Sequence, residues 1–226
     1  MTPIKKTLLL VLSLVLSIIS LNLAAQPSAA KIPASPPAGF LSKYAVVNGV
    51  KIHYVTGGAG TPLLLIHGFG QNWYMWNRLL PELSKHFTLV VPDLRGVGES
   101  AKPAGGYDKK TLAVDLHELM KKLGYKKADI AGHDVGLMVA YAYAAQFPDD
   151  VEKVALLDAL LAGIEPVWSQ VKAQAWWFAF FSQPHSGELV TGRFDILFED
   201  FWPEVSFVKT NYLYNITGIP YGVPHS

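Results

Sequence analysis

Asp134 lies at the centre of a glycine-bounded motif that could present a nucleophile. The motif, Gly132-His133-Asp134-Val135-Gly136, stands between a short apolar run, 128–131, and a small-residue helical run, 136–146. It matches the strand–turn–helix pattern G-x-S-x-G with Asp in place of Ser. Side chains at the two outer positions of so tight a turn would clash, which explains both glycines. The alternative interpretation is an ordinary turn in which Asp134 only caps the helix.

Other polar residues also follow apolar runs in this part of the chain. His67, Asp93 and Asp158 each come just after such a run, as Asp134 does. Buried strands are indicated by the apolar runs 62–66 and 88–91, and a third and a fourth strand are expected at 128–131 and 151–157. Because ligands bind at the carboxyl ends of the strands in open α/β sheets, these side chains are expected to gather at one site.

The elements that must position these residues alternate along the chain. Helices are expected at 73–86, at 108–123 with Asp108 as the N-cap, and at 136–146, where Phe147 and Pro148 stop the last one. Strands alternating with helices predict an α/β fold with a mostly parallel sheet and helices on both faces. Upstream, β-rich runs at 43–47 and 51–56 flank Asn48-Gly49, which is a strong hairpin signal.

The composition favours an ordinary globular domain. The chain has 226 residues, half of them hydrophobic, with a formal net charge of +1. This balance gives no indication of a nucleic-acid partner. Cysteine is absent, which excludes disulfides, thiolate catalysis and cysteine-bound metal. The aromatic residues that crowd the segment after Asp158 indicate an apolar pocket, so we expect a small apolar substrate and no nucleic-acid partner.

The amino-terminal residues have the pattern of an export signal. Lys5 and Lys6 precede an apolar run at 8–23, and small residues follow it. We interpret residues 1–25 as a signal peptide and residues 26–39 as a Pro/Ala-rich linker. The protein is then expected to be periplasmic or secreted, with no stable membrane partner beyond the signal peptide. The alternative is that the same run is an uncleaved membrane anchor.

Two loops complete a resemblance to a known family. Ile66-His67-Gly68-Phe69-Gly70 follows one expected strand, and a second loop, Asp93-Leu94-Arg95-Gly96-Val97-Gly98-Glu99-Ser100, follows the next. Together with the Asp134 motif, they make the chain from about Phe40 to Asp158 resemble the epoxide hydrolase and haloalkane dehalogenase branch of the α/β-hydrolase fold. We expect residues 40–160 to be the amino-terminal part of that core. Residues 161–226 would form a partial helical cap and a divergent tail.

The resemblance implies roles for the motif residues. Asp134 would be the nucleophile, and the backbone N–H groups of Phe69 and Val135 would form the oxyanion hole. Asp158 would be the acid that orients a catalytic histidine, although it could instead be a capping residue in a connecting loop. Asp93 is expected to brace its own loop. The resemblance implies no cofactor and no metal.

An aspartate nucleophile restricts the chemistry. A carboxylate that attacked an ester would form a more reactive anhydride, so an ordinary ester hydrolase would carry Ser or Cys at position 134. A carboxylate can instead open an epoxide or expel a halide from an sp³ carbon. The resulting enzyme ester then needs water and a general base.

The leaving group is indicated by the neighbours of the nucleophile. Haloalkane dehalogenases usually carry Trp directly after the aspartate, where this chain has Val135. Fluoroacetate dehalogenases carry Arg there and nearby, where Val135 and Met138 are uncharged. We therefore favour an epoxide, with a haloalkane dehalogenase-like hydrolase as the alternative. In the cap, Trp176 and Trp177 are expected to line the substrate pocket; a plain core role for this aromatic run is equally consistent with the sequence.

The chain departs from the family in its histidines. The family base follows the last strand, far beyond the nucleophile, whereas only His185 and His225 follow Asp158 here. The other histidines, including His67 and His133, are expected to be structural. We therefore expect a sequence truncated at its carboxyl end that lacks the catalytic His and full turnover. A non-catalytic fragment is the further alternative.

Overall fold

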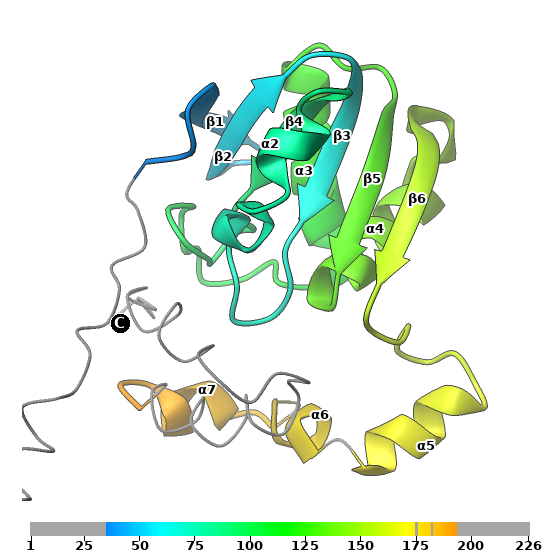
Figure 1. Cartoon of the computed structure of the whole chain (residues 1–226). Helices are drawn as coiled ribbons and strands as arrows, with labels where there is room; N and C mark the ends of the chain where they lie inside the picture. The colour runs from blue at the N-terminus through cyan, green and yellow to red at the C-terminus, as the bar shows by residue number, and fades with distance from the viewer. Residues whose placement is uncertain (1–34, 175, 182, 194–226) are drawn as a thin grey trace, which may run out of the picture. The chain divides into compact units, whose positions relative to one another are not determined.

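The computed structural model describes residues 35–174, 176–181 and 183–193 of the protein (Figure 1). The expected signal peptide at 1–25, most of the expected linker at 26–39 and the expected tail beyond 193, including His225, lie outside the described residues. In the described part of the chain, no helix is both long and apolar enough to cross a membrane.

A β-hairpin opens the described fold. Strands β1 (Phe40–Val47) and β2 (Val50–Gly58) pair antiparallel around Asn48 and Gly49. Both turn residues have positive φ, 47° at Asn48 and 74° at Gly49. A two-residue turn that matches the twist of the strands needs this backbone conformation, and Asn-Gly is the pair that adopts it most easily. The hairpin predicted from the sequence is confirmed.

The remaining strands extend the hairpin into one sheet. They are β3 (Thr61–Ile66), β4 (Phe87–Pro92), β5 (Ala128–His133) and β6 (Val151–Leu157). The strand order is β1-β2-β4-β3-β5-β6, in which β3 pairs parallel with β4 and β5, and β5 pairs parallel with β6. The mostly parallel sheet expected from the alternating pattern is confirmed. The polar residues that follow these strands therefore lie at the same edge of the sheet.

Two long helices cover one face of the sheet. They are α3 (Lys109–Lys122) and α4 (Val135–Gln146), and the short helix η2 (Pro148–Asp150) follows α4. Asp108 caps α3 as predicted, because its side chain accepts a hydrogen bond from the Thr111 backbone N–H. The apolar face of α3 is buried against the sheet in a cluster that includes Leu112, Leu116, Leu119, Leu64, Ile66, Val90 and Ile130.

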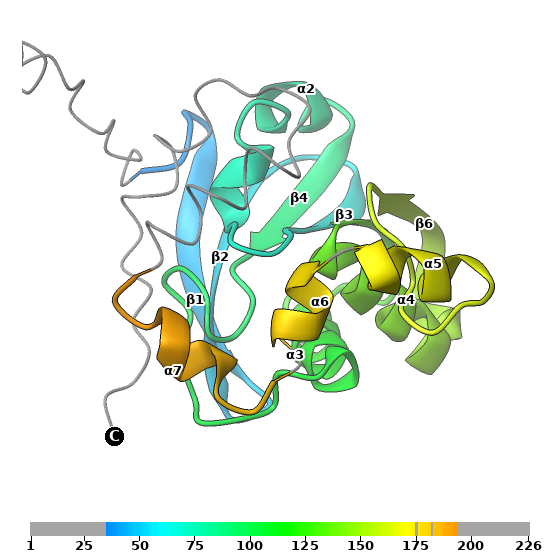
Figure 2. The same cartoon turned by 90° about the horizontal axis from the view of Figure 1, so that it is seen from below.

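The opposite face is covered by short helices, as Figures 1 and 2 show for α2. These are η1 (Trp73–Trp76) and α2 (Leu80–Leu83), which bury Trp73, Trp76 and Leu80. The continuous helix predicted over 73–86 is therefore wrong in its continuity. Pro81 stands in the first turn of α2, where its missing N–H costs nothing, but inside a longer helix it would break a hydrogen bond. Helices on both faces were correctly predicted.

The segment after β6 is helical. It contains α5 (Val167–Gln174), α6 (Trp176–Phe181) and α7 (Ser186–Val190). The rings of Phe181 in α6 and Phe69 in the loop after β3 lie 4.9 Å apart. The sequence prediction of helices in this segment is thus met as far as the structure describes it.

Candidate active site

Asp134 occupies a strained turn between β5 and α4. Its backbone has φ 52° and ψ −118°, a conformation that non-glycine residues adopt only when the surrounding structure enforces it. A Cβ on Gly132 would lie 2.1 Å from the Gly136 carbonyl oxygen, and one on Gly136 would lie 2.4 Å from the Ile66 carbonyl oxygen. The two glycines therefore permit the turn for the steric reason that the sequence suggested.

The Asp134 side chain does not cap the helix that it precedes. Helix α4 has no side-chain capping hydrogen bond from Asp134. Instead, the backbone N–H of Phe69 donates a 2.8 Å hydrogen bond to Asp134 Oδ2. The capping alternative considered for the motif is thus not what the structure has. The amino end of α4, which begins at Val135, lies next to the carboxylate in the chain and favours negative charge there.

The loop after β3 approaches Asp134 closely because it contains Gly68. A Cβ at Gly68 would lie 2.9 Å from Asp134 Cβ, closer than side-chain atoms pack. The loop is further held by the Gly68 N–H, which donates to Gln71 Oε1 at 2.9 Å. This packing brings the Phe69 N–H to the carboxylate, the position expected of an oxyanion-hole donor. The second expected donor, the Val135 N–H, remains a prediction.

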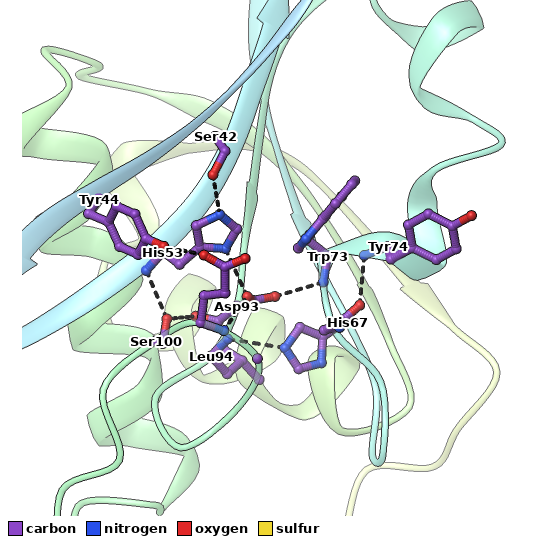
Figure 3. Close-up of polar contacts among 12 residues, drawn as sticks. Ser42, Tyr44, His53, His67, Trp73, Tyr74, Asp93, Leu94 and Ser100 are labelled. Carbon is purple, nitrogen blue, oxygen red and sulfur yellow. Dashed lines mark hydrogen bonds and ion pairs between the residues drawn. The ribbon is translucent and has the colours of Figure 1, made fainter. Parts of the chain in front are cut away.

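His67 is buried, and both of its ring nitrogens have partners. Nε2 accepts from the Leu94 backbone N–H at 3.1 Å, so the proton is on Nδ1, which lies 2.9 Å from the Gly68 carbonyl oxygen (Figure 3). Burial lowers the pKa of His67, although nearby Asp93 and Asp134 act in the opposite direction. A neutral ring with both nitrogens engaged shapes the loop, as expected from the sequence.

Asp93 braces its loop, as predicted. Its Oδ1 accepts from the Trp73 N–H at 2.9 Å (Figure 3), and its Oδ2 accepts from the Glu99 N–H at 2.9 Å. A Cβ at Gly98 would lie 2.2 Å from Asp93 Oδ2, so the loop can close around the carboxylate only with glycine there. The same carboxylate also contacts His53.

Asp158 lies next to the turn that carries Asp134, but its described partner is an unexpected one. It follows β6 with φ 55°, and the Asp134 N–H donates to the carbonyl of the preceding Leu157 at 3.0 Å. Its carboxylate is 88% exposed and lies 3.5 Å from His133 Nε2. The sequence predicts only a structural role for His133. The role of Asp158 in orienting a catalytic histidine remains a prediction.

Lys109 is a site residue that the sequence analysis missed. It begins α3, and its burial lowers the pKa of its ammonium group, whereas the negative charges of Asp134 and Asp108 raise it. The charge of Lys109 is therefore coupled to that of Asp134. The only signal in the sequence was its position after a helix cap, which gives no information about a residue 25 positions further along the chain.

The aromatic helix α6 carries the expected pocket residues Trp176 and Trp177. Their rings are 6.1 Å apart in an edge-to-face arrangement, and the Trp176 side chain is partly exposed. The helix reaches the loop after β3 through Phe181 and Phe69. The substrate-binding role of the two tryptophans remains a prediction. Across the described residues, no group of three or more His, Cys, Asp or Glu side chains could hold a metal ion.

Comparison with known proteins identifies relatives of two hydrolase types. The chain is 48% identical over 114 residues to the soluble epoxide hydrolase of Corynebacterium sp. (strain C12), which covers 50% of this chain and 40% of that protein. It is 39% identical over 153 residues to the fluoroacetate dehalogenase of Burkholderia sp., covering 65% of this chain and 50% of that protein. The chain thus spans about half the length of these relatives or less.

Solved structures show the same similarity. The ligand-free epoxide hydrolase CorEH superposes with a TM-score of 0.65 and 36% identity, covering 72% of this chain and 59% of that one. Cfl2 from Burkholderia cenocepacia superposes with a TM-score of 0.67 and 34% identity, covering 79% of this chain and 63% of that one. Residues 61–196 match the family model described as the alpha/beta hydrolase fold. The protein therefore belongs to the α/β-hydrolase fold family.

Proposed function

We propose that this protein is a hydrolase of the epoxide hydrolase type, in which Asp134 opens the epoxide by forming a covalent ester. The observation that carries the proposal is the placement of the Asp134 carboxylate. It stands in the strained turn after β5, does not cap α4, and accepts a hydrogen bond from Phe69 N–H. A strained residue aimed away from its helix is typical of a functional site.

The hydrogen bond distinguishes the two carboxylate oxygens. Oδ2 is held by the Phe69 N–H, so Oδ1 would make the attack. After attack, Oδ2 becomes the carbonyl oxygen of the ester and remains next to the same donor. When water adds to that ester, the developing negative charge falls on Oδ2, where a fixed backbone N–H stabilises it.

The first step needs no base. An Oδ1–carbon bond forms, the carbon–oxygen bond of the epoxide breaks, and the ring oxygen takes a proton from solvent. The second step, hydrolysis of the ester, is accelerated about a hundred to ten thousand fold by a general base. In a chain without such a base, the ester on Asp134 would be long-lived, and with one it would turn over to diol.

The comparisons support a substrate that is attacked at an sp³ carbon. They leave two substrate classes open, epoxides and halogenated compounds. The soluble epoxide hydrolase has the higher identity, and the fluoroacetate dehalogenase match covers more of the chain. Val135 and Met138 leave the site without the arginines expected for a carboxylate-bearing haloacid. We therefore favour an epoxide, and retain a dehalogenase-like hydrolase as the second candidate.

Mass spectrometry of the full chain tests the proposal. The protein is incubated with styrene oxide, or in parallel with 1-chlorobutane or fluoroacetate, and then digested with trypsin. Asp134 falls in the tryptic peptide 128–153, which also contains Asp129, Asp149 and Asp150. Fragment ions must therefore place the adduct on Asp134. We expect one styrene oxide adduct per chain at this residue.

Matched variants complete the test. Asp134→Asn should abolish the adduct, because an amide is a far poorer nucleophile. The exposed Asp149, changed to Asn in the same peptide, should leave the adduct unchanged. If diol accumulates instead, incubation in ¹⁸O-labelled water decides the mechanism. Turnover through the ester places ¹⁸O in Asp134, and diol formation with neither adduct nor label would contradict the proposal.

A further inference from the structure

A hydrogen-bonded line of three side chains lies apart from Asp134. Ser42 Oγ is 2.8 Å from His53 Nε2, and His53 Nδ1 is 2.8 Å from Asp93 Oδ2 (Figure 3). A serine, a histidine and an aspartate thus follow one another at hydrogen-bond distance. This is the geometry in which a histidine activates a serine hydroxyl and a carboxylate orients the histidine.

The hairpin and the sheet bring these residues together. In the β1–β2 register, Tyr44 lies opposite His53, so Ser42, two residues away on β1, is the diagonal neighbour of His53 on the same face. Asp93 follows β4, which pairs with β2, and its N–H donates to the His53 carbonyl at 2.9 Å. The sequence alone does not predict this Ser42–His53–Asp93 arrangement, because the arrangement depends on the register of three paired strands.

The protonation pattern is the one that a base requires. Burial alone would raise the pKa of Asp93, but hydrogen bonds from His53 and from the N–H groups of Trp73 and Glu99 hold that pKa below its usual value. An ionised carboxylate only accepts, so His53 carries its proton on Nδ1. With the proton on Nδ1, Nε2 is placed to accept a hydrogen bond from the Ser42 hydroxyl.

Burial separates the roles along the line. His53 and Asp93 are 1% and 0% exposed, whereas Ser42 lies on the exposed side of β1. The inner pair is also fixed, since the His53 N–H donates to Ser100 Oγ at 2.8 Å and Ser100 Oγ donates to the Asp93 carbonyl at 2.7 Å. A reagent from solvent can therefore reach the hydroxyl, while the base behind it is held in place.

We propose that Ser42 is a reactive serine, activated by His53 and Asp93, that takes up an acyl or phosphonyl group from an activated electrophile. With a fluorophosphonate, an Oγ–phosphorus bond forms, the phosphorus–fluorine bond breaks, and fluoride leaves. The hydroxyl proton passes to His53 Nε2 and from there to solvent. The proposal covers formation of this covalent adduct and is independent of Asp134.

Labelling of the native full chain with a fluorophosphonate tests the proposal, with Ser169 as the internal comparison. Ser169 is also exposed, and its Oγ bonds to Glu165 Oε1 at 2.7 Å, so it has a carboxylate partner but no histidine. Tryptic peptide 32–43 contains Ser35 and Ser42, and fragment ions distinguish them. We expect Ser42 to react at least about tenfold faster than Ser169, since general-base help is typically worth more than this.

Controls connect the rate to the geometry. In urea the two serines should react at equal rates, and Ser42→Ala should remove the label from peptide 32–43. His53→Gln should reduce labelling of Ser42 to the rate at Ser169. If that variant does not fold, the ratio in the native unmodified chain still decides the question. Equal rates at Ser42 and Ser169 in the native chain would overturn the proposal and leave the line as a purely structural network.

Discussion

At the scale of single residues, the charge around Asp134 comes from a different part of the chain. Lys109 begins α3, and its pKa reflects both its own burial and the negative charge of Asp134. A partly buried cation near enough to feel the charge of Asp134 attracts anionic molecules to the site more than neutral ones. The lysine therefore provides a means of testing which substrate class suits the site.

We expect Lys109→Met to slow reaction of Asp134 with fluoroacetate or chloroacetate several-fold more than its reaction with styrene oxide. The reason is that one charge–charge interaction near a protein surface is worth about one to a few kcal/mol. Rates of adduct formation on peptide 128–153 measure the effect. Lys110→Met, which removes an exposed charge from the neighbouring position, is the control and should change neither rate. Equal slowing of both reagents would contradict an electrostatic role for Lys109.

Residues within one turn could be predicted from the sequence, and residues that meet across elements could not. The glycines around Asp134 and the Phe69 loop have fixed spacing, so their geometry follows from local sterics. The His133–Asp158 contact joins the ends of neighbouring strands. That contact depends on the directions of the two side chains, which cannot be predicted from the spacing of residues in the sequence. The same holds for Lys109.

At the scale of elements, one buried ion pair attaches the loop after β4 to helix α3. Arg95 Nε and Nη2 each donate to Asp115 at 2.6 Å, and Asn48 Nδ2 donates to the same carboxylate at 2.7 Å. Both charged side chains are almost fully buried. The hydrogen bonds that Arg95 donates to Asp115 favour the charged guanidinium and raise the pKa of Arg95. The pair links the hairpin turn, the loop and the helix.

Arg95→Met should destabilise this region by about 3–5 kcal/mol, because it leaves the Asp115 carboxylate buried without its partner. Faster amide hydrogen exchange in α3, by at least about a hundredfold, is the expected readout. The double variant Arg95→Met with Asp115→Leu should recover most of the protection, since removing both charges avoids the buried unpaired one. Unchanged exchange in the single variant would show that the pair contributes nothing to α3.

The elements themselves followed the sequence closely where one signal dominated. The strand 151–157 was predicted with the bounds that β6 has, because an apolar run between turn residues defined it. Helix 108–123 was predicted from Asp108 and the leucine spacing, and α3 agrees. The segment 73–86 differed because apolar spacing favoured one helix, whereas Pro81 favours a break before α2.

At the scale of the whole molecule, β6 is an apolar strand with a single neighbour among the described strands, and most of it is exposed. Strand β6 pairs with β5 on one side, yet all of its residues after Val151 are exposed. Val154, Leu156 and Leu157 are 38%, 41% and 39% exposed. Because side chains alternate along a strand, Leu156 and Leu157 show apolar surface on both faces of the sheet. Edge strands of this kind are templates for pairing with another chain.

We therefore expect the purified chain to self-associate through β6, and Val154→Lys to suppress that association. A lysine on an edge strand opposes strand pairing, because its charge would be buried against the partner. Light scattering at matched protein concentrations measures the effect. Leu79→Lys is the control: it adds the same charge at a residue that is 50% exposed and lies outside the sheet. That variant should associate like the parent chain. If both variants suppress association equally, net charge and not the edge is responsible. A parent chain that stays monomeric and melts cooperatively would show that the exposed strand β6 does not cause self-association.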